Sequence, residues 1–146
     1  MQSRQARASV KNPRITDNKA VEIVDALGID ISKYDKFMSH EGVVARTVML
    51  DRQLQEIIRK NPETVIINVG AGFDDRFSRV DNGKIIWFDL DLPDVITARK
   101  KAFSEKNRVT MIAGNILDSS GANLSGQPFQ RKRQSPSFWL KVFSCI

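Results

Sequence analysis

Two glycines and two aspartates stand at a spacing that could bind a nucleoside. Gly70 and Gly72 follow directly after an apolar, β-branched run at residues 64–69. Asp89 and Asp91 close a second apolar run, 19 and 21 residues after Gly70. Glycines at such a turn let the backbone approach a ligand, and a carboxylate about 20 residues further on accepts hydrogen bonds from ribose hydroxyls. The pattern indicates a ligand that contains adenosine.

This ligand is expected to lack a phosphate. A dinucleotide fingerprint G-x-G-x-x-G would need glycine at position 75, where the chain has Asp75 beside Asp74. Two carboxylates there would repel a pyrophosphate from the helix start that normally binds it. The sequence also has no G-x-x-x-x-G-K-[ST] loop. S-adenosylmethionine is the common ligand with adenosine and no phosphate, and its cationic sulfonium suits an acid-rich rim. Arg76 and Arg79 are interpreted as structural partners of these or neighbouring carboxylates.

The region around these residues resembles a known enzyme family. The run VIINVGAGFDDRFSRVDNGKIIWFDLDLPDVITARK is similar to the core of class I methyltransferases of the leucine carboxyl methyltransferase family, including its branch similar to polyketide O-methyltransferases. The segments DNKAVEIVDALGIDISKYDKF and VVARTVMLD resemble the same branch. The resemblance covers about residues 12–118, and GAGFDDRF and WFDLDLPDVI are its most specific parts. The family usually has threonine at the position of Asp75.

The resemblance implies a binding site for S-adenosylmethionine, starting at the methionine end of the cofactor. Gly70, Ala71 and Gly72 would line the methionine part through backbone groups. Arg46 would pair with the methionine carboxylate, a contact that suits a guanidinium. Taken without the resemblance, the glycines could form only a tight turn, and Arg46 could be an ordinary solvated residue of a helix.

At the nucleoside end, the resemblance implies four further binding residues. Asp91, with Asp89 beside it, would accept the ribose hydroxyls, although Asp89 could instead cap the following helix. Asn115 and Ile116 would flank the adenine. The family's later acidic residue, in an Ala-Glu-Gly segment of the fourth strand, has no counterpart in the sequence. The reaction implied is methyl transfer to a carboxylate or hydroxyl of a small molecule, and no residue is identified as the general base.

Alternating strand and helix patterns surround these residues. Apolar spacing predicts helices over residues 16–27, 39–60, 74–80 and 93–106, and β-branched runs predict strands over 64–69, 84–90 and 109–113. Alternation of this kind predicts an α/β fold with a Rossmann-like, doubly wound parallel sheet. A class I methyltransferase has seven strands, so three strands indicate an incomplete domain whose activity is in doubt.

Composition narrows the class of protein further. The length of 146 residues fits one domain, and the sequence shows neither a membrane-spanning run nor a secretory signal, which favours the cytoplasm. The single cysteine and single histidine argue against a metal site. The net charge of +6 lies at the ends, because residues 1–14 and 119–146 each carry +4 while residues 15–118 carry −2. A nucleic-acid or membrane partner is therefore not expected.

The same boundaries divide the chain into three parts. Residues 1–14 are interpreted as a flexible basic arm, 15–118 as the N-terminal part of a methyltransferase domain and 119–146 as an irregular tail. A shifted reading of one reverse translation of the last nine residues gives Leu-Ala-Glu-Gly-Leu-Phe-Met-Tyr, a family-like fourth strand. This suggests the hypothesis of a frameshift near residues 126–131. One rival function remains open, a non-catalytic module that binds the cofactor. A basic nucleic-acid binder acting through the charged ends is the less favoured rival, because residues 15–118 are acidic.

Overall fold

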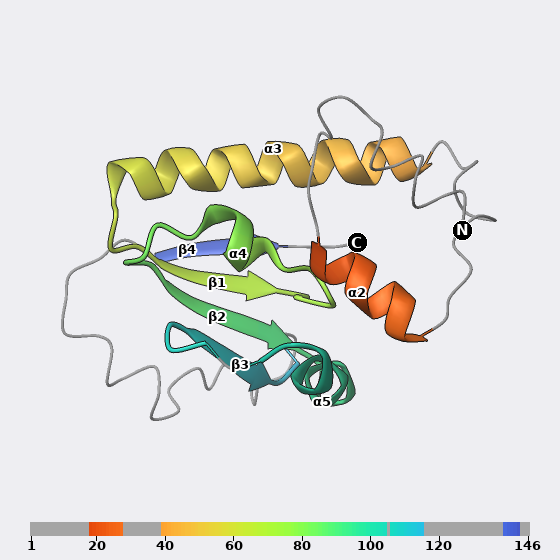
Figure 1. Cartoon of the computed structure of the whole chain (residues 1–146). Coiled ribbons are helices and arrows are strands. Elements are labelled where there is room, and N and C mark those ends of the chain that lie inside the picture. The colour runs from red at the N-terminus through yellow and green to blue at the C-terminus, as the bar shows by residue number, and fades with distance from the viewer. Residues whose placement is uncertain (1–17, 28–38, 105, 116–138, 144–146) are drawn as a thin grey trace. The chain divides into compact units, whose positions relative to one another are not determined.

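The computed structural model describes residues 18–27, 39–104, 106–115 and 139–143. The chain divides into two compact units, Met1–Gln53 and Leu54–Ile146. The first unit contains α2 (Asn18–Leu27) and most of α3 (Ser39–Lys60), labelled as in Figure 1. Both helices are confirmed over the part of the chain that the structure describes. None of the helices described there is long and apolar enough to cross a membrane.

The second unit is built on one parallel sheet with the strand order β3-β2-β1-β4 (Figure 1). Its strands are β1 (Val65–Val69), β2 (Ile86–Asp91), β3 (Val109–Ala113) and β4 (Trp139–Phe143). Between them come the helices α4 (Arg76–Val80) and α5 (Pro93–Ala102). Each pair of neighbouring strands is parallel. The predicted α/β fold with a Rossmann-like parallel sheet is confirmed.

Strand β4 corrects the expectation of three strands and of a tail that is irregular throughout. Residues 139–143 pair with the free edge of β1, so that Val65 lies opposite Trp139 on one side and opposite Ile86 on the other. The backbone amides and carbonyls on that edge of β1 would otherwise lack partners, which is costly for a buried strand. The sequence of the tail has no alternating pattern that reveals this pairing, because the requirement comes from β1. The rest of the tail, residues 119–138 and 144–146, lies outside the described residues.

The two strands β1 and β2 bury side chains on both faces of the sheet. On one face, Ile66 and Trp87 pack with residues from the end of α3, from α4 and from the position just before β2: Leu54, Ile58, Phe77, Val80 and Ile85. The rings of Phe77 and Trp87 meet edge to face with centroids 5.9 Å apart. On the other face, Val65, Ile67 and Phe88 form a second apolar cluster. Burial on both faces explains why the strand sequences are nearly continuous apolar runs.

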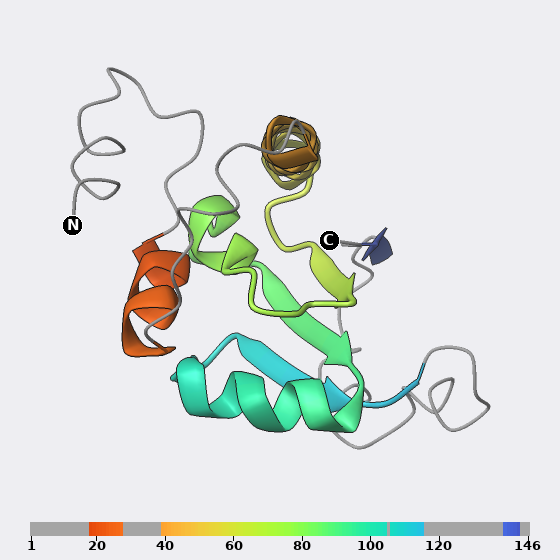
Figure 2. The ribbon, with the colours of Figure 1, turned by 90° about the vertical axis from the view of Figure 1, so that its right-hand side faces the viewer.

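Two helix ends differ from the predicted positions. Helix α4 begins at Arg76, two residues later than predicted. Helix α5 ends at Ala102, four residues earlier than predicted, because Phe103 is extended and its ring is buried beneath the guanidinium of Arg99, 4.1 Å from the ring centroid. Figures 1 and 2 show α5 lying across the direction of the strands, nearly end-on in the first view and lengthwise in the second. This orientation places α5 beside the carboxyl ends of the strands.

A turn at the opposite end of the sheet, formed by Asp81, Asn82 and Gly83, connects α4 to β2. Gly83 has a φ of 81°, and its amide donates to the Asp81 carboxylate at 2.9 Å. The amides of Lys84 and Ile85 donate to the side-chain oxygen of Asn82. Arg108 forms a bidentate ion pair with Asp81 and also donates to the carbonyl of Ile85. The turn is thereby tied to the start of β3.

The ion pair predicts a pH-dependent contribution to stability. Hydrogen bonding to Arg108 lowers the pKa of Asp81 below its ordinary value. A carboxyl whose pKa is lowered by folding stabilises the fold above about pH 3.9, the pKa in an unfolded chain, and this contribution is lost as the pH falls through the folded pKa. Replacing Asp81 with asparagine should therefore reduce the free energy of unfolding by about 0.5–1 kcal/mol at pH 7 and much less at pH 3. Urea unfolding at both pH values measures this difference, and an equal loss at both would contradict it.

Candidate functional site

The predicted glycine turn follows β1 and contacts β2. Gly70 has a φ of 68° and Gly72 a φ of 48°, so both adopt the left-handed conformation that favours glycine. The amide of Gly70 donates to the carbonyl of Leu90 at 2.9 Å. Ala71 is completely buried, whereas a Cβ added at Gly72 would meet no atom within 4 Å. The turn therefore presents the backbone of Gly72 to open space at the carboxyl end of the sheet.

Asp91 lies against this turn. Its Oδ2 accepts the Gly72 amide at 2.8 Å, and its Oδ1 accepts the amide of Leu92 at 2.8 Å. The structure thus brings together two residues that the sequence singled out at a separation of 19 positions. Asp91 is half-buried, and an ionised carboxylate offers about four acceptor positions, so the two backbone hydrogen bonds leave capacity for a ligand's hydroxyls.

Asp89 has different surroundings from Asp91. It is completely buried. Its Oδ1 accepts the side-chain amide of Asn68 at 2.9 Å and the indole N–H of Trp87 at 2.8 Å. Its Oδ2 pairs with Arg99 at 2.9 Å. Both oxygens are therefore engaged inside the protein, so burial does not favour the predicted contact with ribose. Asp89 does not cap α5 either, because the N-cap residue of that helix is Leu92.

The two acidic residues after the turn are paired with basic groups. Asp74 contacts Arg79 at 2.7 Å and Arg76 at 3.0 Å, which confirms the interpretation of both arginines as structural partners. Asp75 lies 3.5 Å from the amine of Lys106. These neighbouring cations offset the two carboxylates, so the electrostatic part of the argument against a pyrophosphate does not hold. The part that depends on the missing glycine at position 75 is unaffected.

The remaining predicted site residues are only partly placed. Asn115 is half-buried and follows Gly114, whose amide donates to the carbonyl of Asp91 at 2.9 Å, so it lies at the same end of the sheet. Ile116 lies outside the described residues. Arg46 is an exposed residue of α3 in the first unit, and the geometry of the second unit does not include it. The cofactor contacts of these three residues stay predictions.

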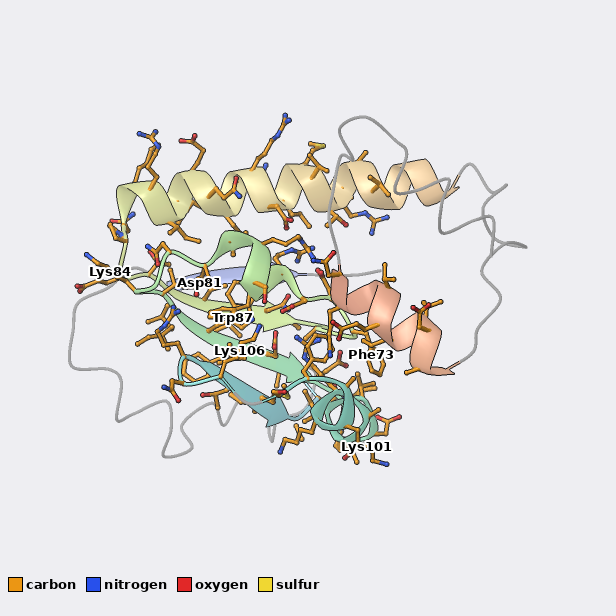
Figure 3. The ribbon with its side chains drawn as sticks, in the orientation of Figure 1. Phe73, Asp81, Lys84, Trp87, Lys101 and Lys106 are labelled. Atoms are coloured by element: carbon orange, nitrogen blue, oxygen red, sulfur yellow. The ribbon has the colours of Figure 1, made fainter. Side chains whose placement is uncertain are left out.

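Exposed apolar side chains flank the contact between Gly72 and Asp91. Phe73 is 41% exposed and Leu92 is 46% exposed, although both are large apolar residues. Figure 3 shows Phe73 at the carboxyl end of the sheet, with Asp81 and Lys84 at the opposite end. Exposed apolar groups around a few polar groups are typical of surfaces that bind a ligand or another part of a protein.

The sequence interpretation missed Arg99, which contacts both the glycine turn and Asp89. In the sequence it is one of three basic residues in the last turn of α5. Its only distinguishing signal is its spacing, three residues after Ile96 and four before Phe103, which places it on the buried side of the helix. Its contacts with the turn come from tertiary structure.

The fold and the site together define an α/β protein with the 3-2-1-4 strand order of a doubly wound, Rossmann-like sheet and a glycine turn after its first strand. The sequence profile of the leucine carboxyl methyltransferase family matches residues 3–142 of the chain. The chain therefore belongs to the leucine carboxyl methyltransferase family. The match extends at both ends beyond residues 12–118, where the resemblance was expected.

A curated protein that is similar in sequence to this chain is named as an O-methyltransferase. The chain is 26% identical over 106 residues to the tetracenomycin polyketide synthesis O-methyltransferase of Streptomyces glaucescens. The aligned region covers 71% of this chain and 39% of the relative. The chain thus spans about two fifths of the length of the curated relative it matches.

No metal site is found in the part of the chain that the structure describes, since no group of His, Cys, Asp and Glu side chains there is arranged to hold an ion. The site offers a ligand the open space beside the backbone of Gly72, the half-buried carboxylate of Asp91 and the exposed apolar side chains of Phe73 and Leu92. These groups can bind and orient a neutral or cationic ligand that carries hydroxyl groups.

Proposed function

We propose that this chain binds S-adenosylmethionine as part of an O-methyltransferase that acts on a small molecule. The hydrogen bond between the Gly72 amide and Asp91 Oδ2, at 2.8 Å beside open space, is the observation that carries the proposal. Asp91 would accept the ribose hydroxyls with its remaining lone pairs. Gly70, Ala71 and Gly72 would line the methionine part through their backbone.

Three further residues complete the proposed cofactor site. Asn115 and Ile116 would flank the adenine, and Arg46 would pair with the methionine carboxylate. The family and the name of the Streptomyces relative support an acceptor oxygen on a small molecule, either a carboxylate or a hydroxyl. When bound, the cofactor supplies a methyl group on a sulfonium, which a nucleophilic oxygen can take by direct displacement.

The described residues contribute binding and orientation to this reaction. Asp91 and the glycine turn hold one end of the ligand, so that the transferred group has a defined position relative to the acceptor. Phe73 and Leu92 would lose their exposure to water when the site is filled. No described side chain is assigned the role of general base.

Titration calorimetry with S-adenosylhomocysteine, the demethylated cofactor, tests the binding step. We expect saturable binding with one site per chain, and no binding of NAD or ATP under the same conditions. A transfer assay with methyl-labelled cofactor and small hydroxylated or carboxylated acceptors then tests the reaction. Binding without transfer would support the non-catalytic module instead, and failure to bind S-adenosylhomocysteine would contradict both functions.

A glycine substitution separates ligand contact from backbone strain. Replacing Gly72 with alanine should lower the free energy of unfolding by about 1–2 kcal/mol, the cost of a side chain in the left-handed conformation. It should also weaken S-adenosylhomocysteine binding at least about tenfold, because the added methyl group would occupy the open space beside Asp91. Calorimetry and urea unfolding measure the two effects.

Gly83 provides the matched control. It has a φ of 81° and likewise no atom within 4 Å of an added Cβ, but it lies in the turn at the other end of the sheet. Its replacement by alanine should cause a similar loss of stability without changing the affinity. Equal affinities of the two variants would argue against a ligand at Gly72.

A further inference from the structure

One buried arginine ties the glycine turn to the elements beneath it. Arg99 of α5 donates Nη1 to the carbonyl of Gly72 at 2.8 Å and Nη2 to the carbonyl of Asp74 at 3.0 Å. The same Nη2 pairs with Asp89 Oδ2 at 2.9 Å. Arg99 is 3% exposed, and its guanidinium packs over the ring of Phe103. A single side chain therefore joins α5, β2 and the loop after β1.

Gly72 is held on both sides by these contacts. Its amide donates to Asp91 and its carbonyl accepts from Arg99. The planar guanidinium can reach two carbonyls and a carboxylate at once, because its donors point in fixed, divergent directions. A lysine amine is a compact point charge and cannot span the same three acceptors.

We propose that Arg99 is a positioning residue, which holds the glycine turn in the conformation that binds the cofactor. By holding the carbonyls of Gly72 and Asp74, it keeps the Gly72 amide on Asp91 and thereby sets the direction of the carboxylate that receives the ribose. Arg99 does not touch the ligand in this arrangement. The role in ligand binding rests on the proposed function, whereas the role in shaping the loop can be measured without a ligand.

The test compares two conservative variants, Arg99→Lys and Arg108→Lys, in the full chain. Arg108 is a matched control, because it also pairs with an aspartate and a backbone carbonyl, near the turn at the opposite end of the sheet. Two-dimensional amide NMR of the ligand-free chain reports the hydrogen bond from Gly72 to Asp91 through the downfield position of the Gly72 amide proton. Calorimetry then gives the affinity for S-adenosylhomocysteine.

For Arg99→Lys we expect the Gly72 amide proton to move upfield, and the affinity for S-adenosylhomocysteine to fall about tenfold, as for one weakened charge-assisted contact. Arg108→Lys should leave both values unchanged. An unchanged Gly72 resonance in Arg99→Lys, or equal shifts in both variants, would overturn the positioning role. If the parent chain does not bind S-adenosylhomocysteine, the proposed function fails while the Gly72 resonance still decides the role of Arg99.

A second variant covers the case in which Arg99→Lys does not fold. Combining Arg99→Met with Asp89→Asn removes both charges of the buried pair and leaves no charged group without its partner. In this variant the Gly72 amide proton should also move upfield while the secondary structure measured by circular dichroism is kept. If this variant and Arg99→Lys are both unfolded, Arg99 is a requirement of folding as a whole, and the narrower positioning role is overturned.

Discussion

Replacing Asp91 with alanine should lower the affinity for S-adenosylhomocysteine at least about 100-fold. The substitution removes the carboxylate that would accept the ribose hydroxyls, and it also removes the acceptor of the Gly72 amide. Hydrogen bonds to a charged group contribute about 1.5–3 kcal/mol each, so the loss of two accounts for this magnitude. Titration calorimetry of the two proteins measures the change.

Asparagine at position 91 separates the loss of the negative charge from the loss of the hydrogen bond to the Gly72 amide. Asp91→Asn keeps an oxygen that can accept the Gly72 amide but removes the negative charge, so it should bind more tightly than Asp91→Ala and more weakly than the parent chain. Asp94→Asn is the matched control, because Asp94 is an exposed carboxylate in the first turn of α5. An affinity of Asp91→Ala equal to that of Asp94→Asn would remove the support for the proposed ribose contact.

Replacing Asp89 should chiefly lower the stability of the fold, whereas replacing Asp91 should chiefly lower the affinity for the ligand. Asp89→Asn leaves the buried guanidinium of Arg99 without its carboxylate. Removing one partner of a buried ion pair costs about 3–5 kcal/mol, a large part of the stability of an ordinary domain. We expect the midpoint of urea unfolding, followed by circular dichroism, to fall accordingly.

The two aspartates can be compared directly with these measurements. Asp91→Asn should change the free energy of unfolding far less than Asp89→Asn, because Asp91 is half-buried and the asparagine oxygen can keep one of its two backbone hydrogen bonds. If Asp89→Asn kept its stability and lost affinity as Asp91→Asn does, Asp89 would contact the ligand and the distinction drawn from burial would be wrong.

Local patterns predicted most of the elements correctly. The β-branched run before Gly70 forms β1, and Val109–Ala113 forms β3 over the predicted residues. These predictions succeeded because alternation, apolar spacing and turn residues act over short distances along the chain. Strand β4 was missed because its pairing depends on the free edge of β1, a partner about 70 residues away in the sequence.

The same distinction applies to the site. The spacing of the glycines and aspartates predicted that a turn and a carboxylate would meet at the carboxyl end of the sheet, and Gly72 and Asp91 do meet there. Their spacing could not rank Asp89 against Asp91, since residues two apart in a strand point to the same face. The contact with Arg99 distinguishes the two aspartates. Arg99 reaches from α5 to the buried Asp89, whereas Asp91 stays half-buried at the edge of the site.

The sequence by itself therefore determined the alternation of strands and helices, the glycine turn and the position of the acids along the chain. These features depend on residue type and spacing, which are local properties. Only the tertiary structure decided that residues 139–143 add a fourth strand to the sheet, that Asp89 is buried while Asp91 remains accessible, and that Arg99 holds the turn. Those features depend on which elements come into contact, because burial and ion pairing are set by neighbours that are distant in the sequence.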